Sequence, residues 1–553
     1  MRGAGQVRWA AGVMAVALAA AACGGGTGGG GGGDGGGDGG GDGGAADIVS
    51  SSWGDAQNPL EPGNTNESQG GKVLDMVFRG LRRYDPKTGE ARNLLAERIE
   101  TADRQHFTVT VKDGWKFSNG EPVTSRSFVD AWNYAADVRN KQKNGYHFSN
   151  IVGYDDVHPA TGDPRATGMS GLVVKDDRTF TVALKKKYAT WPQTLGHHTF
   201  YPLPRTFFTD HAGWLAKPVG NGPYTVDSYA KGTALKLRRW SGYPGEDKAL
   251  NGGVDLRVYN DANTAYTDLL AGNLDLVDDI PTQQLKQVHK DLGDRYITRP
   301  ALVIATLVFP MYDPQWNKEG MEKVRKGIAM AIDRDEITRQ IFHGTRTPAT
   351  DWTSPALGTK GGFSKDACGK ACTYDPAEAK RLVQEGGGLP GGRMTLTSNV
   401  DAGSHREWMD AVCNGINNVL GEGPVCTVNP IGTFVEFRNQ VTEHRVPGPF
   451  RSSWQGDYPY IQEFLQPLYY TGATDNDGMF SDTRFDGLVD AAQEAADVEE
   501  ATRLFLDAEK ILAEQVPVVP LWYQDGTAGF SKRLSNVTLN QYGTPVYDRI
   551  EIG

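Results

Sequence analysis

The sequence predicts an α/β fold with mixed sheets (α+β), and three observations predict it. Short strand-like segments end in glycine turns, and several helical segments carry their own capping residues. Strands and helices alternate irregularly, with no repeat of about 20 to 50 residues. At 553 residues the chain exceeds one ordinary domain, so about two to four domains are expected.

Three segments are predicted as strands. Residues 108–111 (Thr-Val-Thr-Val) precede Asp113-Gly114, and residues 115–117 precede Asn119-Gly120. Such pairs favour turns with positive φ. Residues 179–184 alternate polar and apolar side chains and end in three lysines, which indicate a solvated strand end rather than a binding patch.

Helices are indicated by their capping residues. Asp375 can cap a helix, Pro376 fits its first position and Gly386 can end it. Two further segments show similar signals, the capping pair Asp333 with Glu336 and the helical spacing of Leu504, Ala508, Ile511 and Leu512 before Pro517.

The composition is typical of a soluble globular protein, with 39% hydrophobic and 23% charged residues. The net charge is −11. Phosphate binding needs clustered Lys and Arg, so this acidic excess argues against a nucleic-acid partner.

The N-terminus has the pattern of a secretory signal. Arg2 and Arg8 lead into an apolar stretch, residues 9–22, which is followed by Cys23. The stretch is shorter than the roughly 20 residues of a membrane-spanning helix, so residues 1–22 are predicted as a signal peptide. The mature protein is expected outside the cell.

Residues 20–24 (Ala-Ala-Ala-Cys-Gly) resemble the lipobox of bacterial lipoproteins. The resemblance implies that Cys23 is acylated and anchors the protein to the lipid bilayer, on the outer face of the bacterial cell membrane. Ordinary signal-peptide cleavage is the alternative, because Ala20 stands where lipoproteins usually have Leu. Residues 24–44 hold only Gly, Thr27 and three Asp residues, so residues 23–46 are predicted to form a flexible tether with a reach of roughly 25 Å.

Four further cysteines, Cys368, Cys372, Cys413 and Cys426, allow two interpretations. They could bind a structural zinc ion, but their spacings do not match a zinc ribbon. An even number of cysteines in an exported chain favours disulfides, with Cys368–Cys372 and Cys413–Cys426 as the pairing that closes the shortest loops.

From residue 57 onward the chain resembles the extracellular solute-binding proteins of ABC importers that bind oligopeptides, dipeptides or nickel. The motifs that carry the resemblance are Asn58-Pro59-Leu60-Glu61-Pro62, Val77-Phe78-Arg79-Gly80-Leu81, residues 84–90, 95–97 and 112–124, Gly220-Asn221-Gly222-Pro223-Tyr224, residues 271–275, 324–334 and 374–376, and Val518-Val519-Pro520-Leu521-Trp522-Tyr523. Their order and spacing cover most of the mature chain.

The resemblance implies a two-lobe clamp that closes on ligand in the manner of periplasmic binding proteins, with an extra inserted subdomain. Lobe I would consist of residues 47–80, 201–300 and 521–553, with the subdomain at 81–200. Lobe II would consist of residues 301–520.

The same resemblance identifies a segment that contacts the ligand, residues 451–459 (Arg-Ser-Ser-Trp-Gln-Gly-Asp-Tyr-Pro). Asp457 matches an Asp that accepts the α-ammonium group in peptide-binding relatives, and the segment before it, with Ser453, would pair with the peptide as an added strand. The alternative for Asp457 is a turn cap.

Four further residues are candidates at this site. Arg451 coincides with an Arg that faces the ligand carboxylate in some peptide binders; the alternative is a surface or ion-paired residue. Ser68 falls where the opposite lobe offers its backbone to the ligand. Trp454 and Tyr458 are expected either to line the cleft or to pack the hinge.

The resemblance therefore predicts a monomeric binding protein that delivers peptides to an ABC permease, with a non-peptide solute such as an oligosaccharide or a metal chelate as the alternative. An enzyme is the main rival class. The sequence has no Gly-x-Ser-x-Gly, His-Glu-x-x-His or phosphate loop. Adjacent His197 and His198, on a strand, would face opposite sides and could not easily share one metal ion. No catalytic residue, cofactor or metal is therefore expected.

Overall fold

The computed structural model describes residues 47–401, 404–421 and 423–553. The predicted signal peptide (1–22) and the predicted tether (23–46), with Cys23, lie outside the described residues. Within the described part of the chain, every helix is too short or too polar to cross a bilayer.

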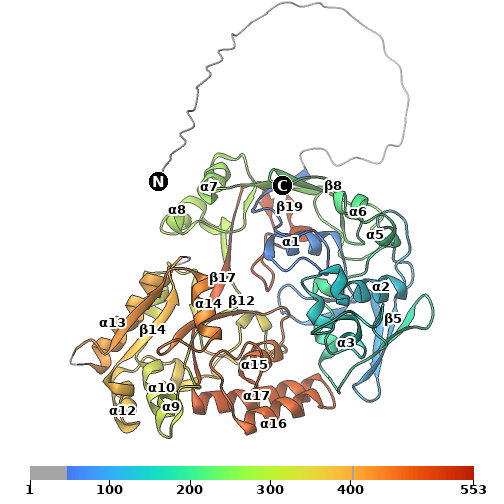
Figure 1. The fold of residues 1–553 in the computed structure, drawn as a ribbon. Helices are drawn as coiled ribbons and strands as arrows, with labels where there is room; N and C mark the ends of the chain where they lie inside the picture. Colours follow the sequence, from blue (N-terminus) through green and yellow to red (C-terminus); the bar gives the residue numbers. More distant parts are fainter. Residues whose placement is uncertain (1–46, 402–403, 422) are drawn as a thin grey trace, which may run out of the picture. The chain divides into compact units, whose positions relative to one another are not determined.

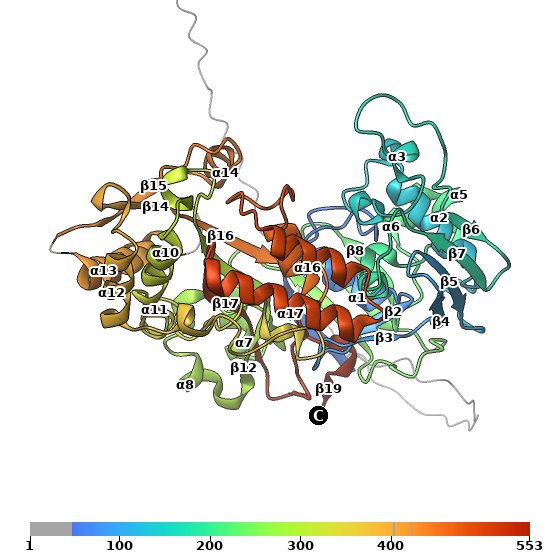
Figure 2. The same cartoon turned by 90° about the horizontal axis from the view of Figure 1, so that it is seen from below.

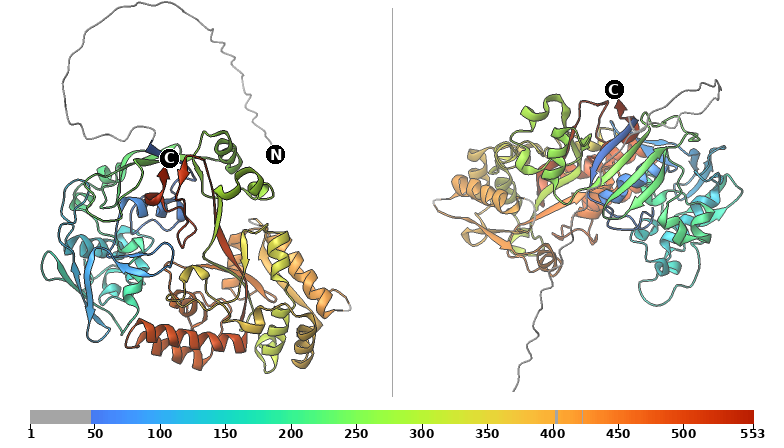
Figure 3. Two further views of the ribbon diagram at one scale, coloured as in Figure 1. Left: turned by 180° about the vertical axis from the view of Figure 1, so that it is seen from behind. Right: turned by 90° about the horizontal axis from the view of Figure 1, so that it is seen from above.

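One mixed sheet of 11 strands connects the two halves of the chain (Figures 1 and 3). Its strands are, in order across the sheet, β15 (Cys426–Ile431), β14 (Met394–Asn399), β16 (Phe450–Gln455), β12 (Tyr296–Val308), β17 (Val518–Phe530), β11 (Leu276–Val277), β1 (Ile48–Trp53), β10 (Gly253–Val258), β9 (Ala234–Arg239) and β8 (Tyr224–Ala230), with β13 (Arg346–Pro348) beside β17. Parallel and antiparallel pairs both occur, which confirms the mixed-sheet prediction.

Three smaller sheets accompany the main sheet. The largest has the order β4 (Ala96–Thr101), β5 (His106–Val111), β7 (Thr179–Ala183), β6 (Leu172–Val174). The other two are hairpin-sized, β2 (Arg82–Tyr84) with β3 (Ala91–Asn93) and β18 (Leu534–Ser535) with β19 (Glu551–Ile552).

The helices flank the long strands on both sides. Figure 1 shows α2, α5 and α6 on one side of β12 and β17 and α10, α12 and α13 on the other, and Figure 2 shows α16 beside α17. The helices before β12 are α1 (Ser68–Val77), α2 (Ser125–Ala136), α3 (Tyr154–Val157), α4 (Trp191–Thr194), α5 (Arg205–Thr209), α6 (His211–Ala216), α7 (Ala262–Ala271) and α8 (Val288–Leu292). Those after it are α9 (Pro314–Asn317), α10 (Met321–Met330), α11 (Arg334–Gln340), α12 (Pro376–Glu385), α13 (His405–Leu420), α14 (Phe434–Thr442), α15 (Gln462–Tyr469), α16 (Thr483–Gln493) and α17 (Val498–Gln515).

Two large hydrophobic cores divide the structure into two lobes. One core takes its side chains from residues 49–256 and from a few positions in 276 and 534–550, and the other takes them from residues 302–523 together with Tyr84. A third, small core lies within residues 265–292. We use lobe I for the part built on the first core and lobe II for the part built on the second. The predicted boundaries at 81, 201, 301 and 521 stay predictions.

The long strands β12 and β17 run from one core into the other. On β12, Ile297 packs against the core of lobe I and Leu302 belongs to the core of lobe II. On β17, Tyr523 belongs to lobe II and Phe530 packs against lobe I. The pairing of these strands shifts register between Pro300 and Ile304, so an irregularity lies where the chain crosses between the lobes.

The capped helices form as the sequence predicts. The Asp375 carboxylate accepts a hydrogen bond from the Glu378 N–H (3.0 Å) at the start of α12. The Asp333 carboxylate accepts one from the Glu336 N–H (2.9 Å) at the start of α11. The long helix α17 ends at Gln515, before Pro517.

The predicted strand at 115–117 is wrong. In the described structure only Lys116 pairs, in a single bridge with Pro122. Both predicted turns exist, with φ of 82° at Gly114 and 90° at Gly120. The two turns leave only three residues between them, which is too few for a ladder of strand hydrogen bonds.

Both disulfides in the structure lie in lobe II. Cys368 is bonded to Cys372, and Cys413 on α13 is bonded to Cys426 at the start of β15. This is the pairing that closes the shortest loops. The second bond ties a helix to the edge strand of the main sheet.

Candidate ligand-binding site

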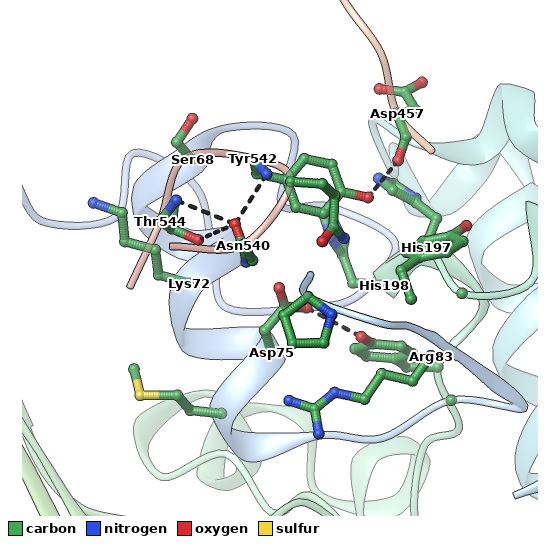
Figure 4. Close-up of a pocket in the computed structure, with 18 of the residues that line it drawn as sticks. Ser68, Lys72, Asp75, Arg83, His197, His198, Asp457, Asn540, Tyr542 and Thr544 are labelled. Atoms are coloured by element: carbon green, nitrogen blue, oxygen red, sulfur yellow. Dashed lines mark hydrogen bonds between the residues drawn. The ribbon is translucent and has the colours of Figure 1, made fainter. Parts of the chain in front are cut away.

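A cavity of about 700 Å³ lies between side chains of lobe I and side chains of lobe II (Figure 4). Its volume is in the range of small-molecule binding sites. Lobe I contributes α1, the 3₁₀ turn Gly145–Phe148, residues 196–198 with Tyr201, and the loop 540–548; lobe II contributes Gln455, Gly456 and Asp457.

Asp457 brings a carboxylate into this cavity directly after β16. Its side chain is 34% exposed, and its Oδ2 accepts a hydrogen bond from the Tyr146 hydroxyl (3.1 Å). Its backbone N–H donates to Glu463 Oε1 (3.2 Å), and its carbonyl accepts from the Tyr542 hydroxyl (2.8 Å). The backbone is therefore held from both sides, and Oδ1 accepts no hydrogen bond from any described residue.

Glu463 lies behind Asp457 and is almost completely buried. Burial, and then the neighbouring Asp457 carboxylate, raise the pKa of Glu463 well above its ordinary value. Two adjacent carboxyl groups cannot easily ionise together, so the buried Glu463 keeps its proton and Asp457 carries the charge. The pair thus presents one negative charge to the cavity.

Four rings form a row beside Asp457. Tyr146 and His147 stack with centroids 4.3 Å apart, His147 and His197 are 4.7 Å apart, and His197 and His198 are 4.1 Å apart. We call these four residues the ring row. It forms part of the cavity wall.

The strand geometry expected for His197 and His198 is wrong. His197 is the N-cap of a 3₁₀ turn, His198–Phe200, and its Nδ1 accepts the Thr199 N–H at 3.4 Å. Neighbours at the start of such a turn do not alternate between two faces as strand residues do. The two rings therefore lie face to face. His198 Nε2 is bonded to the Thr65 carbonyl oxygen (2.8 Å).

The two central imidazoles of the ring row are neutral near pH 7. Burial lowers the pKa of His147 to about 4, although the Asp457 carboxylate opposes this shift. Burial and the neighbouring His198 and His147 rings lower the pKa of His197 well below its ordinary value. Both rings can therefore offer a nitrogen lone pair.

The opposite wall of the cavity is built on α1. Ser68 begins this helix and is exposed; Figure 4 shows it across the pocket from Asp457. Further along the helix, Lys72 forms an ion pair with Asp278, and Asp75 accepts a hydrogen bond from the Tyr201 hydroxyl (3.0 Å).

The arginines that follow α1 are already paired. Arg79 contacts Asp247 (3.0 Å) and Asp548 (2.9 Å), and Arg83 contacts Asp548 (3.0 Å) and also Asp247. Two cations thus face two anions, and the group as a whole is neutral. These arginines are therefore poor candidates for binding an anionic ligand.

The strand β16, which leads to Asp457, has one open edge. One side pairs with β12 along its whole length, whereas the other side meets β14 only at Phe450. The Gly456 N–H donates to the Leu302 carbonyl (2.8 Å). In the alternating antiparallel pattern, the backbone groups of Ser453 and Gln455 therefore point away from β12. Among the described residues, no strand pairs with this edge beyond Phe450.

The structure brings some of the predicted site residues together and not others. Asp457 and Ser68 line the cavity, and Ser453 lies on the open edge, exposed, on the same strand face as Gln455. Trp454 points to the other face and lines a separate small cavity of about 20 Å³.

Tyr458 and Arg451 lie outside the lining of the main cavity. Tyr458 is buried next to Tyr188 and Glu463. Arg451 donates to Asn399 Oδ1 (3.3 Å) and lies over the Phe434 ring. Among the described residues it forms no ion pair with a carboxylate. Burial, and then the neighbouring Arg438, lower its pKa.

Sequence reasoning missed the ring row and the lobe I wall. His147 and His197 are 50 positions apart and meet through aromatic packing, because Trp132 lies between Phe148 and Phe200 (ring centroids at 5.9 and 5.4 Å). The pair His197-His198 was the only local signal.

Known proteins share this fold and this chain's sequence pattern. Residues 90–476 match the model of the family described as bacterial extracellular solute-binding proteins, family 5. The oligopeptide-binding protein OppA of Bacillus subtilis is 24% identical over 500 residues, which is 87% of this chain and 88% of OppA. The probable deoxycholate-binding periplasmic protein YgiS of Escherichia coli is 25% identical over 480 residues, which is 84% of this chain and 86% of that protein.

Solved structures agree on the fold. The unliganded open form of MppA, a periplasmic murein tripeptide binding protein, matches with a TM-score of 0.81 at 21% identity, over 92% of this chain and 97% of MppA. The fold and the cavity define a two-lobed binding protein. The chain belongs to the bacterial extracellular solute-binding proteins of family 5, which confirms the resemblance found in the sequence.

Proposed function

We propose that this protein captures peptides in the cavity between its lobes and delivers them to an ABC permease. The observation that carries the proposal is the open edge of β16, which leads straight to the charged Asp457. An extended peptide can add to such an edge through main-chain hydrogen bonds, whatever its sequence.

The peptide's α-ammonium group binds Asp457. This carboxylate carries the single charge of the Asp457–Glu463 pair, and its Oδ1 has no hydrogen-bond donor among the described residues. A cation that satisfies Oδ1 gains a charge-assisted hydrogen bond in a partly desolvated site. Ser453 and Gln455 offer the backbone groups that pair with the peptide.

The remaining candidates act around this core interaction. Arg451, with no carboxylate partner among the described residues, faces the carboxylate end of the peptide. Ser68 offers its backbone from the other wall. Trp454 and Tyr458 support β16 and the segment after it from behind.

The printed names of relatives support a peptide ligand. OppA is an oligopeptide-binding protein, DppE of Bacillus subtilis is a dipeptide-binding protein, and MppA binds a murein tripeptide. The relatives named here are binding proteins, which supports a binding role over catalysis. We propose further that the protein is exported, that Cys23 is acylated and holds it at the outer face of the cell membrane, and that it works as a monomer.

The test is a calorimetric titration of ligand-free protein with short peptides and with the same peptides N-acetylated. Acetylation removes the cation, so affinity should fall by at least about tenfold, and Asp457→Asn should cause a similar loss for the free peptides. The variant should keep its melting temperature, because an Asn side chain can still accept from Tyr146. Equal affinity for free and acetylated peptides would contradict the ammonium site, and no binding of either set would contradict the peptide ligand.

A further inference from the structure

Three side chains in the cavity wall lie close enough to hold one metal ion. His147, His197 and Asp457 each offer a ligand atom, and these atoms all lie within 4.8 Å of one another. His147 Nε2 and Asp457 Oδ2 are 3.6 Å apart. Two ligands belong to lobe I and the third to lobe II.

The His147 nitrogen gives an independent reason to expect a ligand here. Its side chain is 9% exposed, and its Nε2 has no hydrogen-bond partner among the described residues. Buried polar atoms are nearly always satisfied, so an exception calls for a ligand, an ion or a water molecule. This nitrogen lies nearest to a carboxylate, which suits a cation between them.

The donor set indicates which ion would fit. Two neutral imidazoles and one carboxylate are ligands that Zn²⁺ uses in sites with an open fourth position. Tetrahedral zinc with bonds of about 2.0–2.1 Å places its ligand atoms roughly 3.3 Å apart, so the cluster has to contract when the ion binds. His197 gives up at most a long contact of 3.4 Å with the Thr199 N–H.

We propose that His147, His197 and Asp457 form a zinc site across the cavity, with the fourth coordination position open toward the cavity. The ion takes the place that a ligand ammonium group takes on Asp457, so the cavity accepts two kinds of cation. The site uses His197 with His147, and His198 does not belong to it because its Nε2 is bonded to Thr65.

The test is a titration of chelator-treated, tag-free protein with ZnCl₂ alone, in the absence of peptide. We expect one equivalent to bind, and His147→Ala and His197→Ala to weaken binding by at least about tenfold each. The matched control is His198→Ala, which removes the neighbouring ring and should leave zinc affinity within about threefold. Cobalt substitution should give the absorption spectrum of a four-coordinate ion with nitrogen and oxygen ligands.

The outcomes separate this proposal from the proposed peptide function. Peptide titrations in the presence of chelator should show that His147→Ala still binds peptide, whereas Asp457→Asn loses both ligands. Near-UV circular dichroism checks that each variant is folded; if His147→Ala is not, His147→Gln replaces it. Absence of zinc binding by the wild-type protein, or equal loss in the His198→Ala and His147→Ala variants, overturns the zinc site and leaves the peptide site untouched.

Discussion

Tyr146 donates its hydroxyl hydrogen to the Asp457 carboxylate across the cavity, with 3.1 Å between the oxygens. This bond joins lobe I to the segment of lobe II that we assign to the ligand. It uses Oδ2 and leaves Oδ1 without a donor among the described residues. The carboxylate is therefore oriented before a ligand arrives.

Tyr146→Phe should change peptide affinity by no more than about threefold, because the hydrogen bond forms with and without ligand and largely cancels. Asp457→Asn, which removes the charge, should cost at least about tenfold. Calorimetry with one peptide on both variants gives the comparison. A tenfold loss in Tyr146→Phe would mean that the hydroxyl contacts the ligand itself.

Ser453→Pro should abolish peptide binding and leave the protein folded. The Ser453 N–H points away from β12, so proline removes a donor from the open edge and blocks an added strand, a position where edge strands tolerate proline. The matched control is Ser452→Pro, which removes an N–H that faces β12. The control should lower the melting temperature more than Ser453→Pro does. Peptide binding by folded Ser453→Pro would rule out the added strand.

Glu509→Gln should stabilise the protein increasingly as the pH rises. Glu509 is buried on α17, and neither of its carboxyl oxygens accepts a hydrogen bond from a described residue. Asp351 beside it accepts the N–H groups of Thr353 (2.8 Å) and Ser364 (2.7 Å). Burial, and then Asp351, raise the pKa of Glu509 well above its ordinary value, so the folded protein keeps a proton that the unfolded chain releases.

The sign follows from this difference in proton binding. Above the unfolded pKa of about 4.3, the wild-type free energy of unfolding should fall by up to about 1.4 kcal/mol per pH unit on account of this group, until the folded pKa is reached. The glutamine variant has no such proton to hold. Urea unfolding of both proteins at pH 5, 6, 7 and 8 measures the difference, with Glu499→Gln on the exposed face of α17 as the control. A difference independent of pH would contradict a protonated Glu509.

Removing the Cys413–Cys426 disulfide should cost more stability than removing Cys368–Cys372. The first closes a separation of 13 positions and the second a separation of 4. Loop-closure entropy then predicts losses of about 3 and about 2 kcal/mol. Double alanine variants and urea unfolding measure both values. The reverse order would show that strain or packing, rather than chain entropy, decides the effect.

Local signals in the sequence predicted the parts of the fold that depend on neighbouring residues. Asp375 and Asp333 cap their helices as expected, because a cap and its N–H donor are three positions apart. The motif around Asp457 predicted that this residue reaches the cavity. Arg451 and Tyr458 belong to the same motif and lie outside the cavity lining, so sequence proximity alone did not settle their position.

The ring row could not be predicted, for a physical reason. His147 meets His197 only because Phe148 and Phe200 pack on Trp132, and the Trp132 indole N–H donates to the Phe200 carbonyl (3.1 Å). Such contacts depend on tertiary packing between segments far apart in the chain. The expected strand at 197–198 also failed because turn residues override alternation.

The unpaired side of β16 carries a risk that its location removes. A bare strand margin on a protein's surface invites other molecules to stack onto it and can start aggregation. Here that margin ends in a crevice with walls from both lobes, so a compact globule is too thick to enter. Only a single unfolded stretch of chain fits, and the protein thereby sorts its guests by whether they are folded before any side chain is read.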